Sequence, residues 1–417
     1  MLSRIPRSFY AIIPLKIVTS IVSTLVVLMV ITIGGGAAEV SVVMSLTLLG
    51  NLAGTLGWAK VLSITRKYIT GYLGGYFGLF VALIILLNGD LPSIFVSAFL
   101  ITFMSNLTYL AAMFLVSESY GDRLNEMMGL FEMIGGWAWV AGLAFGAVIV
   151  DIINTPLLVG YLALLSLFST ILTSILLGSN IIRRIIEGIK KDFGLLPLLD
   201  MSLERLIEYE ECVPDVILRG FHVVFSGNIM YFPVYIKAKL PSRERASFYL
   251  ALFTQFLAFG LVYSQIIKFI RDIGYTNSIV YLVSLISSVV AAFTYPIAGK
   301  VRKIMKTLIL MNIVRIALFI MLYSIAYIPE TVIMLIMIIF AVLDGYSWAH
   351  ITILLNLVAL KTSKEEVGVS NFIRNIGNII GAILSGIVIS IFSYQIDFIF
   401  AMLILGLSTL FFKKVKV

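Results

Sequence analysis

Two acidic side chains lie deep inside long apolar stretches of this chain, where a charged group is costly. Asp344 is followed by Ser347 and Trp348 at the spacing of one helical face, and Glu132 lies in a stretch rich in glycine. A carboxylate in surroundings of low dielectric can take up a proton near neutral pH or hold a cationic ligand. We therefore expect Asp344 to form a proton or cation site, with a structural pairing to another helix as the alternative. For Glu132, a coupling or binding carboxylate and one half of a structural ion pair are equally open.

Three more apolar stretches carry polar residues at helical spacing, so that these residues share one face of a helix. The three sets are Lys16, Thr19, Ser20 and Ser23; Asn106 and Tyr109; and Asn371, Arg374, Asn375 and Asn378. Such faces are typical of helices that line a cavity, so we expect contacts with a ligand or a gate, for Arg374 above all. Lys16 and Arg315 lie about two or three turns from a basic loop, and for both we favour side chains that extend toward lipid headgroups, although Lys16 is also a candidate for the cavity. We expect His350 to be packed and hydrogen-bonded.

Twelve apolar stretches must position these residues, and each is about long enough to cross a bilayer. A hydrocarbon core of roughly 30 Å requires about 20 apolar residues in helical form, because each backbone group must be satisfied within the segment. The stretches are Ile12–Ile33, Val40–Leu62, Ile69–Leu87, Pro92–Val116, Leu124–Val150, Pro156–Leu177, Ala246–Ile270, Ser278–Ala298, Thr307–Tyr327, Thr331–Leu360, Gly368–Ile391 and Ile396–Phe412. The composition agrees, with 60% hydrophobic and 12% charged residues and a mean hydropathy of +1.07. A soluble domain carries about 25% charged residues, so the chain is predicted to be an all-α membrane protein.

Basic residues gather in alternate loops, which predicts an orientation. Every second connection holds lysine and arginine, whereas the loops between them are nearly bare, and Arg271 is the main exception. The positive-inside bias places both termini in the cytoplasm of a multi-pass protein of the cell membrane, with the basic loops near anionic lipid headgroups. The net charge of +8 is therefore not evidence of a nucleic-acid partner. Counting the apolar stretch 221–236 as a thirteenth span would reverse this pattern, so we place it in the cytoplasm or at the interface.

The chain divides into two halves that resemble each other. Gly129 and Gly142 in the fifth stretch align with Gly368 and Gly381 in the eleventh at a constant offset of 239 residues. A parallel repeat of six plus six spans is an architecture of transporters. The expected units are an N-terminal six-helix bundle over 1–178, a cytoplasmic connector over 179–245 that begins with a basic amphipathic helix, and a C-terminal six-helix bundle over 246–417.

Two loops carry fragments of a family signature. The residues are Gly57 near the end of the second stretch, Arg66 and Lys67 shortly after it, and Gly299, Lys300 and Arg302 after the eighth. Together with the twelve stretches and the repeat, they make the chain resemble the major facilitator superfamily over nearly its whole length. The acidic residue of the signature is missing from both copies, with Val61 in its place in the first, so the cytoplasmic charge latch of the family is absent or built differently. The resemblance implies two pseudo-symmetric bundles in which spans 1, 4, 7 and 10 line a central cavity and spans 2, 5, 8 and 11 flank it.

The resemblance and the buried carboxylates together predict a secondary active transporter that works by alternating access and is coupled to protons. The deep carboxylates and three tryptophans favour export of drugs or lipophilic cations. Lys16, Arg374 and the asparagine face favour an anionic or zwitterionic metabolite as the alternative. A third possibility, from another class, is a non-transporting receptor or assembly protein on this fold, since both loop signatures are degenerate.

No signature of an enzyme is present. The sequence has no phosphate-binding glycine loop followed by Lys and Ser or Thr, which argues against transport driven by ATP. Two histidines and one cysteine, far apart, argue against a metal site, and we expect no cofactor. A single cysteine, Cys212, forms no internal disulfide. We expect a monomer whose partners are a small-molecule substrate, protons and lipid.

Overall fold

The computed structural model describes residues 7–65, 67–119, 124–177, 243–362 and 364–415, and every regular element among them is a helix. Several predictions fall outside these residues. They are the amphipathic helix of the connector, the apolar stretch 221–236, Cys212 and the basic residue Arg66.

The described helices form two sets of six spans. Those of the N-terminal half are α1 (Arg7–Tyr10), α2 (Ile13–Thr32), α3 (Ala37–Thr65), α4 (Tyr68–Leu86), α5 (Leu91–Ser119), α6 (Leu124–Ile149) and α7 (Thr155–Leu177). Those of the C-terminal half are α11 (Arg243–Tyr263), α12 (Ile266–Asp272), α13 (Asn277–Ala298), α14 (Ile304–Ser324), the 3-10 helix η4 (Ile325–Tyr327), α15 (Glu330–Thr362), α16 (Lys364–Ile391) and α17 (Tyr394–Phe412). Twelve spans are long and apolar enough to cross a membrane, with α11–α12 and α14–η4 each counted as one. The all-helical architecture with twelve spans confirms the prediction.

Span seven is not the continuous helix that the sequence predicts over 246–270. It is divided into α11 and α12 at Ser264 and Gln265, where Gln265 adopts φ −112° and ψ −5°. The side chain of Gln265 is fully buried, and its amide donates hydrogen bonds to the backbone oxygen of Ala37 (2.8 Å) and the hydroxyl of Ser41 (2.7 Å) in α3. The break therefore coincides with a polar contact to the other half of the molecule, which no local sequence pattern signals.

Each half is a bundle whose helices approach closely at small residues. In the N-terminal half α4 packs along α5, and Gly75 lies against the backbone of Thr108. In the C-terminal half α11 packs along α16 and α17, and Gly381 lies against the backbone of Leu257. A side chain at either glycine would overlap main-chain atoms, so the helices could not pack at their present separation.

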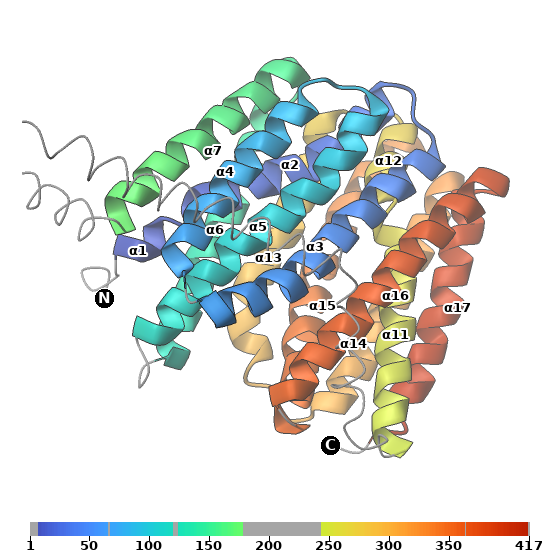
Figure 1. Ribbon diagram of the computed structural model, residues 1–417. Coiled ribbons are helices and arrows are strands. Elements are labelled where there is room, and N and C mark those ends of the chain that lie inside the picture. The colour runs from blue at the N-terminus through green and yellow to red at the C-terminus, as the bar shows by residue number, and fades with distance from the viewer. Residues whose placement is uncertain (1–6, 66, 120–123, 178–242, 363, 416–417) are drawn as a thin grey trace, which may run out of the picture.

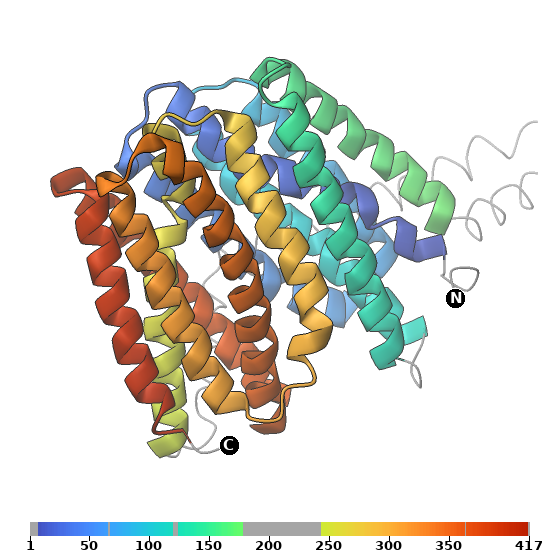
Figure 2. The ribbon, with the colours of Figure 1, turned by 180° about the vertical axis from the view of Figure 1, so that it is seen from behind.

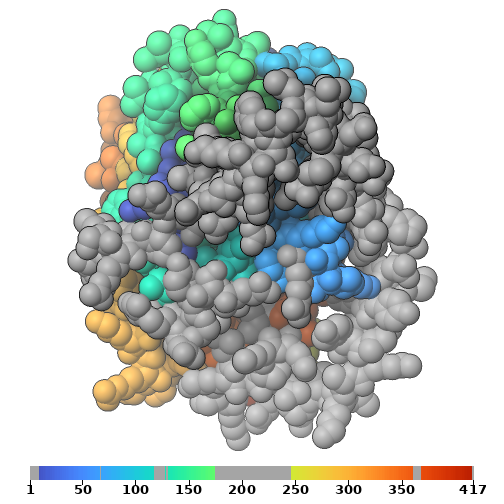
Figure 3. All heavy atoms as spheres, turned by 60° about the vertical axis from the view of Figure 1, so that its left-hand side comes forward, coloured from blue at the N-terminus to red at the C-terminus, as the bar shows by residue number. Residues whose placement is uncertain are grey.

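The two halves meet at one end and separate at the other. We define the far end by the loops 33–36, 87–90, 150–154, 273–276, 328–329 and 392–393, and the terminal end as the opposite one. Three helix pairs that contact each other across the boundary between the halves are α3 with α16, α6 with α13 and α2 with α12. Figures 1 and 2 show the bundles converging toward the far-end loops and diverging toward the terminal end. In the space-filling view of Figure 3, green atoms of the N-terminal half lie directly beside yellow and orange atoms of the C-terminal half along the left-hand side.

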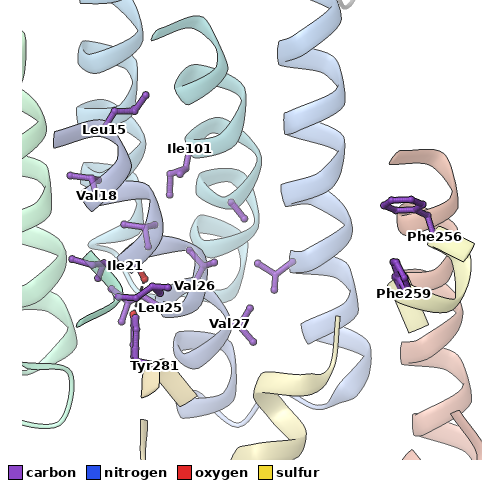
Figure 4. Close-up of a cluster of buried hydrophobic side chains, with 14 of the residues drawn as sticks. Leu15, Val18, Ile21, Leu25, Val26, Val27, Ile101, Phe256, Phe259 and Tyr281 are labelled. Carbon is purple, nitrogen blue, oxygen red and sulfur yellow. Dashed lines mark hydrogen bonds between the residues drawn. The ribbon is translucent and has the colours of Figure 1, made fainter. Parts of the chain in front are cut away.

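The apolar interior of the N-terminal half extends to a side chain from the other half. Figure 4 shows Ile21 and Leu25 of α2 packed with their neighbours and Tyr281 of α13 directed at them, whereas Phe256 and Phe259 project from α11 some way off. Tyr281 is fully buried, and its hydroxyl donates a hydrogen bond of 2.7 Å to the backbone oxygen of Ile21. Helix α2 is therefore held in its own bundle and against α13.

Candidate functional site

A pocket of about 270 Å³ lies in the N-terminal half. Its walls come from α2, α3, α5 and α6, and they combine apolar groups with side-chain hydroxyls and amides. The polar lining residues are Lys16, Thr19, Ser23, Thr47, Asn51, Thr102, Ser105, Asn106 and Tyr109. Among them, the side-chain amide of Asn106 donates to the side-chain oxygen of Asn51 over 2.9 Å. The pocket therefore offers hydrogen-bond donors and acceptors together with a positive charge.

Lys16 supplies this positive charge. Its side chain lies along the wall of the pocket and does not extend toward lipid headgroups. The lysine runs over Gly135, where an added Cβ atom would lie 3.2 Å from the lysine Cε. Its Nζ lies 4.7 Å from the centre of the Tyr109 ring, and the Tyr109 hydroxyl donates a hydrogen bond to a carboxylate oxygen of Glu132. Lys16 and Glu132 also interact electrostatically. The structure thus joins Lys16, Tyr109 and Glu132, which the sequence places on three separate helices.

The carboxylate of Asp344 is held by a network within the C-terminal half. Its Oδ1 accepts hydrogen bonds from Nη1 of Arg315 and from the hydroxyl of Tyr263 (2.5 Å), and its Oδ2 accepts one from the hydroxyl of Ser287 (2.6 Å). Nη2 of Arg315 also donates to the backbone oxygen of Asp344 over 3.0 Å. These residues come from α14, α11, α13 and α15, so one carboxylate ties four helices together.

Arg315 is completely buried, so the prediction that it extends toward lipid headgroups is wrong. It forms a salt bridge with Asp344, and its guanidinium carbon lies 5.1 Å from the ring centres of Phe259 and Tyr263 and 5.7 Å from that of Trp348. A buried cation requires a paired charge, and aromatic faces add to its stabilisation. Asp344 therefore has the helix-to-helix pairing that the sequence leaves open as its alternative role.

Arg374 is a second buried cation of the C-terminal half, with only 7% of its surface exposed. Its Nη1 donates to the side-chain oxygens of Asn356 (2.9 Å) and Asn371 (3.3 Å), and the guanidinium carbon lies 5.6 Å from the ring centre of Phe256. Its Nε and Nη2 have no hydrogen-bond partner among the residues that the structure describes. Unlike Arg315, it therefore has only neutral acceptors in its described surroundings.

Other predicted site residues serve packing in this structure. Ser20 and Ser347 are fully buried, and their hydroxyls donate to the backbone oxygens of Ile17 (2.9 Å) and Asp344 (3.1 Å), so neither lines the pocket. Trp348 packs edge-on and tilted against aromatic rings of α11.

Two asparagines of α16 and the histidine of α15 complete the predicted set. The side chain of Asn375 donates to the backbone oxygen of Asn371 over 2.9 Å, and the backbone oxygen of Asn378 faces Gly260 at the contact with α11. His350 is 3% exposed and its Nδ1 lies 2.9 Å from the backbone oxygen of Tyr346, which agrees with a packed, hydrogen-bonded role.

The predicted gate residues lie at the terminal end. Gly57 is buried in α3, and Lys67 directly precedes α4. Gly299, Lys300 and Arg302 belong to the connection between α13 and α14. Basic connections therefore follow the second span of each half, and their role as a gate stays a prediction.

Sequence reasoning misses several members of these networks. They are Asn51, Tyr263, Ser287 and Asn356. Each is recognised only by its partner on another helix. A local signal exists for Arg315, because Asn312 precedes it by three residues and marks a polar face at depth in an apolar helix.

Hydrogen bonds between the halves lie toward the far end. The backbone nitrogen of Ser278 donates to Oδ2 of Asp151 over 2.9 Å, and the contacts of Gln265 with α3 lie at the same end. Figure 1 shows the halves diverging in the opposite direction. The far end is therefore sealed by polar contacts, while the basic loops lie where the halves separate.

The same architecture occurs in proteins of known structure. Solved structures with a similar fold include the nucleoside transporter NupG (13% identity, TM-score 0.70, covering 99% of this chain and 98% of that chain). A second is the peptide transporter POT in complex with sulfate (13% identity, TM-score 0.64, covering 98% of this chain and 93% of that chain). A third is a POT family transporter in complex with 5-aminolevulinic acid (14% identity, TM-score 0.66, covering 97% of this chain and 95% of that chain). No curated protein matches the sequence. A family model described as Major Facilitator Superfamily matches residues 15–376, which is most of the chain, and the protein therefore belongs to this family of membrane transporters.

Proposed function

We propose that this protein is a secondary active transporter that carries a small polar metabolite, anionic or zwitterionic, by alternating access. One observation carries the proposal. Lys16 lies in a pocket lined by hydroxyl and amide groups, whereas the deep carboxylate of Asp344 is already paired with Arg315.

The lining of the N-terminal pocket suits a polar cargo. Amide and hydroxyl groups that face a site inside the membrane favour a ligand that supplies hydrogen bonds, because an apolar ligand would leave them unpaired. Lys16 can receive a carboxylate or another anionic group, and Glu132 beside it can receive the ammonium group of a zwitterion. The nucleosides, peptides and 5-aminolevulinic acid named for the similar structures are also polar molecules, which supports this choice.

Export of lipophilic cations has weaker support in this geometry. Such a cargo requires an acidic group without a cation of its own, in aromatic surroundings. Asp344 is neutralised by Arg315, and Glu132 interacts with Lys16. The aromatic rings of Phe259 and Trp348 are occupied by the guanidinium of Arg315. The metabolite alternative therefore fits the described charges better than drug export does.

We extend the proposal to proton coupling through Asp344. Protonation of this carboxylate would leave the buried guanidinium of Arg315 without its counter-charge, so the protonated and ionised forms would favour different arrangements of α14 and α15. Tyr263, which donates to Asp344, directly precedes the helix break at Ser264 and Gln265. Gln265 in turn holds α3 of the other half. This chain of contacts offers a physical route from a proton to the seal at the far end.

Uptake into proteoliposomes under an imposed pH gradient tests the proposal. The panel consists of labelled amino acids, dicarboxylates, nucleosides and tetraphenylphosphonium. We expect gradient-driven accumulation of an anionic or zwitterionic member, lost in Lys16→Gln and retained in Lys306→Gln, a matched change at an exposed lysine. Asp344→Asn should still exchange substrate across the membrane but should no longer accumulate it.

Three outcomes contradict parts of the proposal. Transport of tetraphenylphosphonium alone would restore the drug-export alternative. Uphill accumulation by Asp344→Asn would remove the coupling role of that residue. No uptake of any compound would favour a non-transporting receptor or assembly protein.

A further inference from the structure

Arg374 combines deep burial with incomplete pairing. Its surface is 7% exposed, its only described acceptors are the amide oxygens of Asn356 and Asn371, and Nε and Nη2 lack a partner among the described residues. Removing a guanidinium from water is costly unless a negative charge and further acceptors compensate it. Among the described residues, no carboxylate lies within salt-bridge distance of it.

The internal repeat shows why this cation differs from Lys16. Gly142 of α6 packs against Ile17 and Ser20 of α2, and Gly381 of α16 packs in the same way against α11. The α11 residues in that contact are Leu257 and Gly260, each 240 positions after its counterpart in α2, while the two glycines differ by 239. The register derived from sequence therefore agrees with the helix contacts of both halves.

This register puts the two cations at equivalent places. Residue 135 corresponds to 374 and residue 16 to 256, so Lys16 over Gly135 matches Arg374 over Phe256. Each half therefore carries one positive charge where its first and fifth spans meet. The first span supplies it in the N-terminal half, and the fifth span supplies it in the C-terminal half. The acidic neighbour is not repeated, because Glu132 corresponds to Asn371. The N-terminal cation has an acid beside it, and the C-terminal one has a neutral amide.

The polar face around Arg374 is turned away from lipid. At 3.6 residues per turn, the stripe of Asn371, Arg374, Asn375 and Asn378 lies on the side of α16 opposite the exposed apolar residues Ile380, Ile387 and Ile391. Exposed isoleucines on a membrane span face the acyl chains. Asn371 itself is exposed on the polar side, near the terminal end where the halves diverge. Asn371 contacts the guanidinium through its side-chain oxygen and therefore lies between Arg374 and that end.

We propose that Arg374, with the side-chain amides of Asn356 and Asn371, forms a subsite for an anionic group, a carboxylate or a phosphate. The proposal rests on the proposed function and adds, in the C-terminal half, a second place for an anionic group of the cargo beside the one that Lys16 offers. The unpartnered Nε and Nη2 of the guanidinium are two adjacent donors, the arrangement that a carboxylate or phosphate accepts in bidentate fashion. Lys16 and Glu132 in the N-terminal pocket then receive a further charged group of the same molecule.

The test is anion binding to the purified full-length chain, followed by thermal unfolding at constant ionic strength. The probes are acetate and inorganic phosphate, with acetamide as the neutral analogue of acetate. We expect a saturable rise of the unfolding temperature with one or both anions and none with acetamide. Arg374→Gln should weaken the apparent affinity by about tenfold or more, as expected for loss of charged hydrogen bonds. Lys306→Gln, at an exposed lysine of the same half, should retain it.

A second variant separates an anion subsite from a merely structural arginine. Asn371→Glu installs the acid that the N-terminal half has at the equivalent position, so it should stabilise the ligand-free protein and abolish the anion effect. Arg374→Lys, which keeps the charge but loses the planar pair of donors, should bind more weakly than the native protein. These variants keep the test decisive if Arg374→Gln does not fold.

The outcomes separate the subsite from the proposed function. No stabilisation of the native protein by either anion, or full anion binding in Asn371→Glu, would overturn the subsite. Anion binding that depends on Arg374, in a protein that takes up no member of the metabolite panel, would leave the subsite standing and reject the transport proposal. Uptake of an anionic metabolite that is unchanged in Arg374→Gln and Asn371→Glu would reject the subsite and leave the transport proposal standing.

Discussion

Breaking the Asp344–Arg315 pair from one side should destabilise the protein much more than removing both partners together. Arg315 is completely buried and the side chain of Asp344 is 14% exposed, so either residue left alone is a charge without compensation. Breaking a buried pair costs about 3–5 kcal/mol. Asp344→Asn keeps the hydrogen bond from Arg315 to the backbone oxygen of residue 344, so we expect the lower end of that range, about 3 kcal/mol.

The double variant is the informative member of the set. Arg315→Met places an apolar side chain among the rings of Phe259, Tyr263 and Trp348, and Asp344→Asn leaves a neutral amide for Tyr263 and Ser287. The sum of two single losses would be about 6 kcal/mol, whereas replacing a whole buried pair is often close to neutral. We therefore expect a coupling energy of at least about 2 kcal/mol.

Free energies of unfolding in detergent, measured for the native protein and all three variants at neutral pH, give this coupling. The control is the pair Lys268–Asp272, whose charged groups are 3.0 Å apart on adjacent turns of α12 and whose aspartate side chain is 38% exposed. Lys268→Ala there should cost less than about 0.5 kcal/mol. If the losses of the two single variants simply add, the pair is not an electrostatic unit, and our account of Asp344 as a neutralised carboxylate is refuted.

Three further perturbations test the seal and the packing. Gln265→Ala removes a fully buried hydrogen-bond donor from the acceptors on Ala37 and Ser41. We therefore expect faster hydrogen exchange in loops 33–36 and 273–276, equivalent to a free energy of local opening that is lower by about 1–3 kcal/mol. Gln395→Ala serves as the control. Partial burial alone would raise the pKa of Asp151, but hydrogen bonds from Ser278 and Thr276 and the charge of Arg271 outweigh it and hold that pKa below its usual value. Its contact with Ser278 should therefore persist above about pH 4 and weaken as the pH falls through the lowered pKa, an acid dependence measured by exchange at residues 273–278 and absent from Asp151→Asn. Gly381→Ala should destabilise the C-terminal half, because its Cβ would overlap the backbone of Leu257, whereas Gly406→Ala has open space and should be neutral or stabilising in thermal unfolding.

The spans and the cavity helices could be predicted from sequence because their signals are local. Apolar length identifies each span from its own residues, and helical spacing is enough to group Lys16 with Thr19, or Asn106 with Tyr109, on one face. These four residues do line the pocket. Ser20 obeys the same spacing but lies against α6, because a stripe about one hundred degrees wide contains both cavity-facing and helix-facing positions.

Partnerships between helices could not be predicted in this way. Arg315 precedes Asp344 by 29 residues on a neighbouring helix, and distance from a basic loop says nothing about which direction its side chain takes. Asp397 lies in the first turn of α17 and is completely buried, with a hydrogen bond of 3.0 Å from the hydroxyl of Ser385. In both cases the burial of a charge is set by tertiary packing, which a single sequence does not contain.

Alternating access requires the two halves to exchange the seal at the far end for a corresponding seal at the terminal end. Spin labels replace Ile33 and Phe392, exposed on opposite halves at the far end, or Ile64 and Ile297, exposed on opposite halves at the terminal end; Cys212→Ser removes the native thiol. Pulsed electron paramagnetic resonance then gives both distances in proteoliposomes, with and without a compound that the uptake panel identifies. We expect opposite changes, a shorter distance at the terminal end and a longer one at the far end. Binding that leaves both distance distributions unchanged, or shifts them in the same direction, would rule out alternating access.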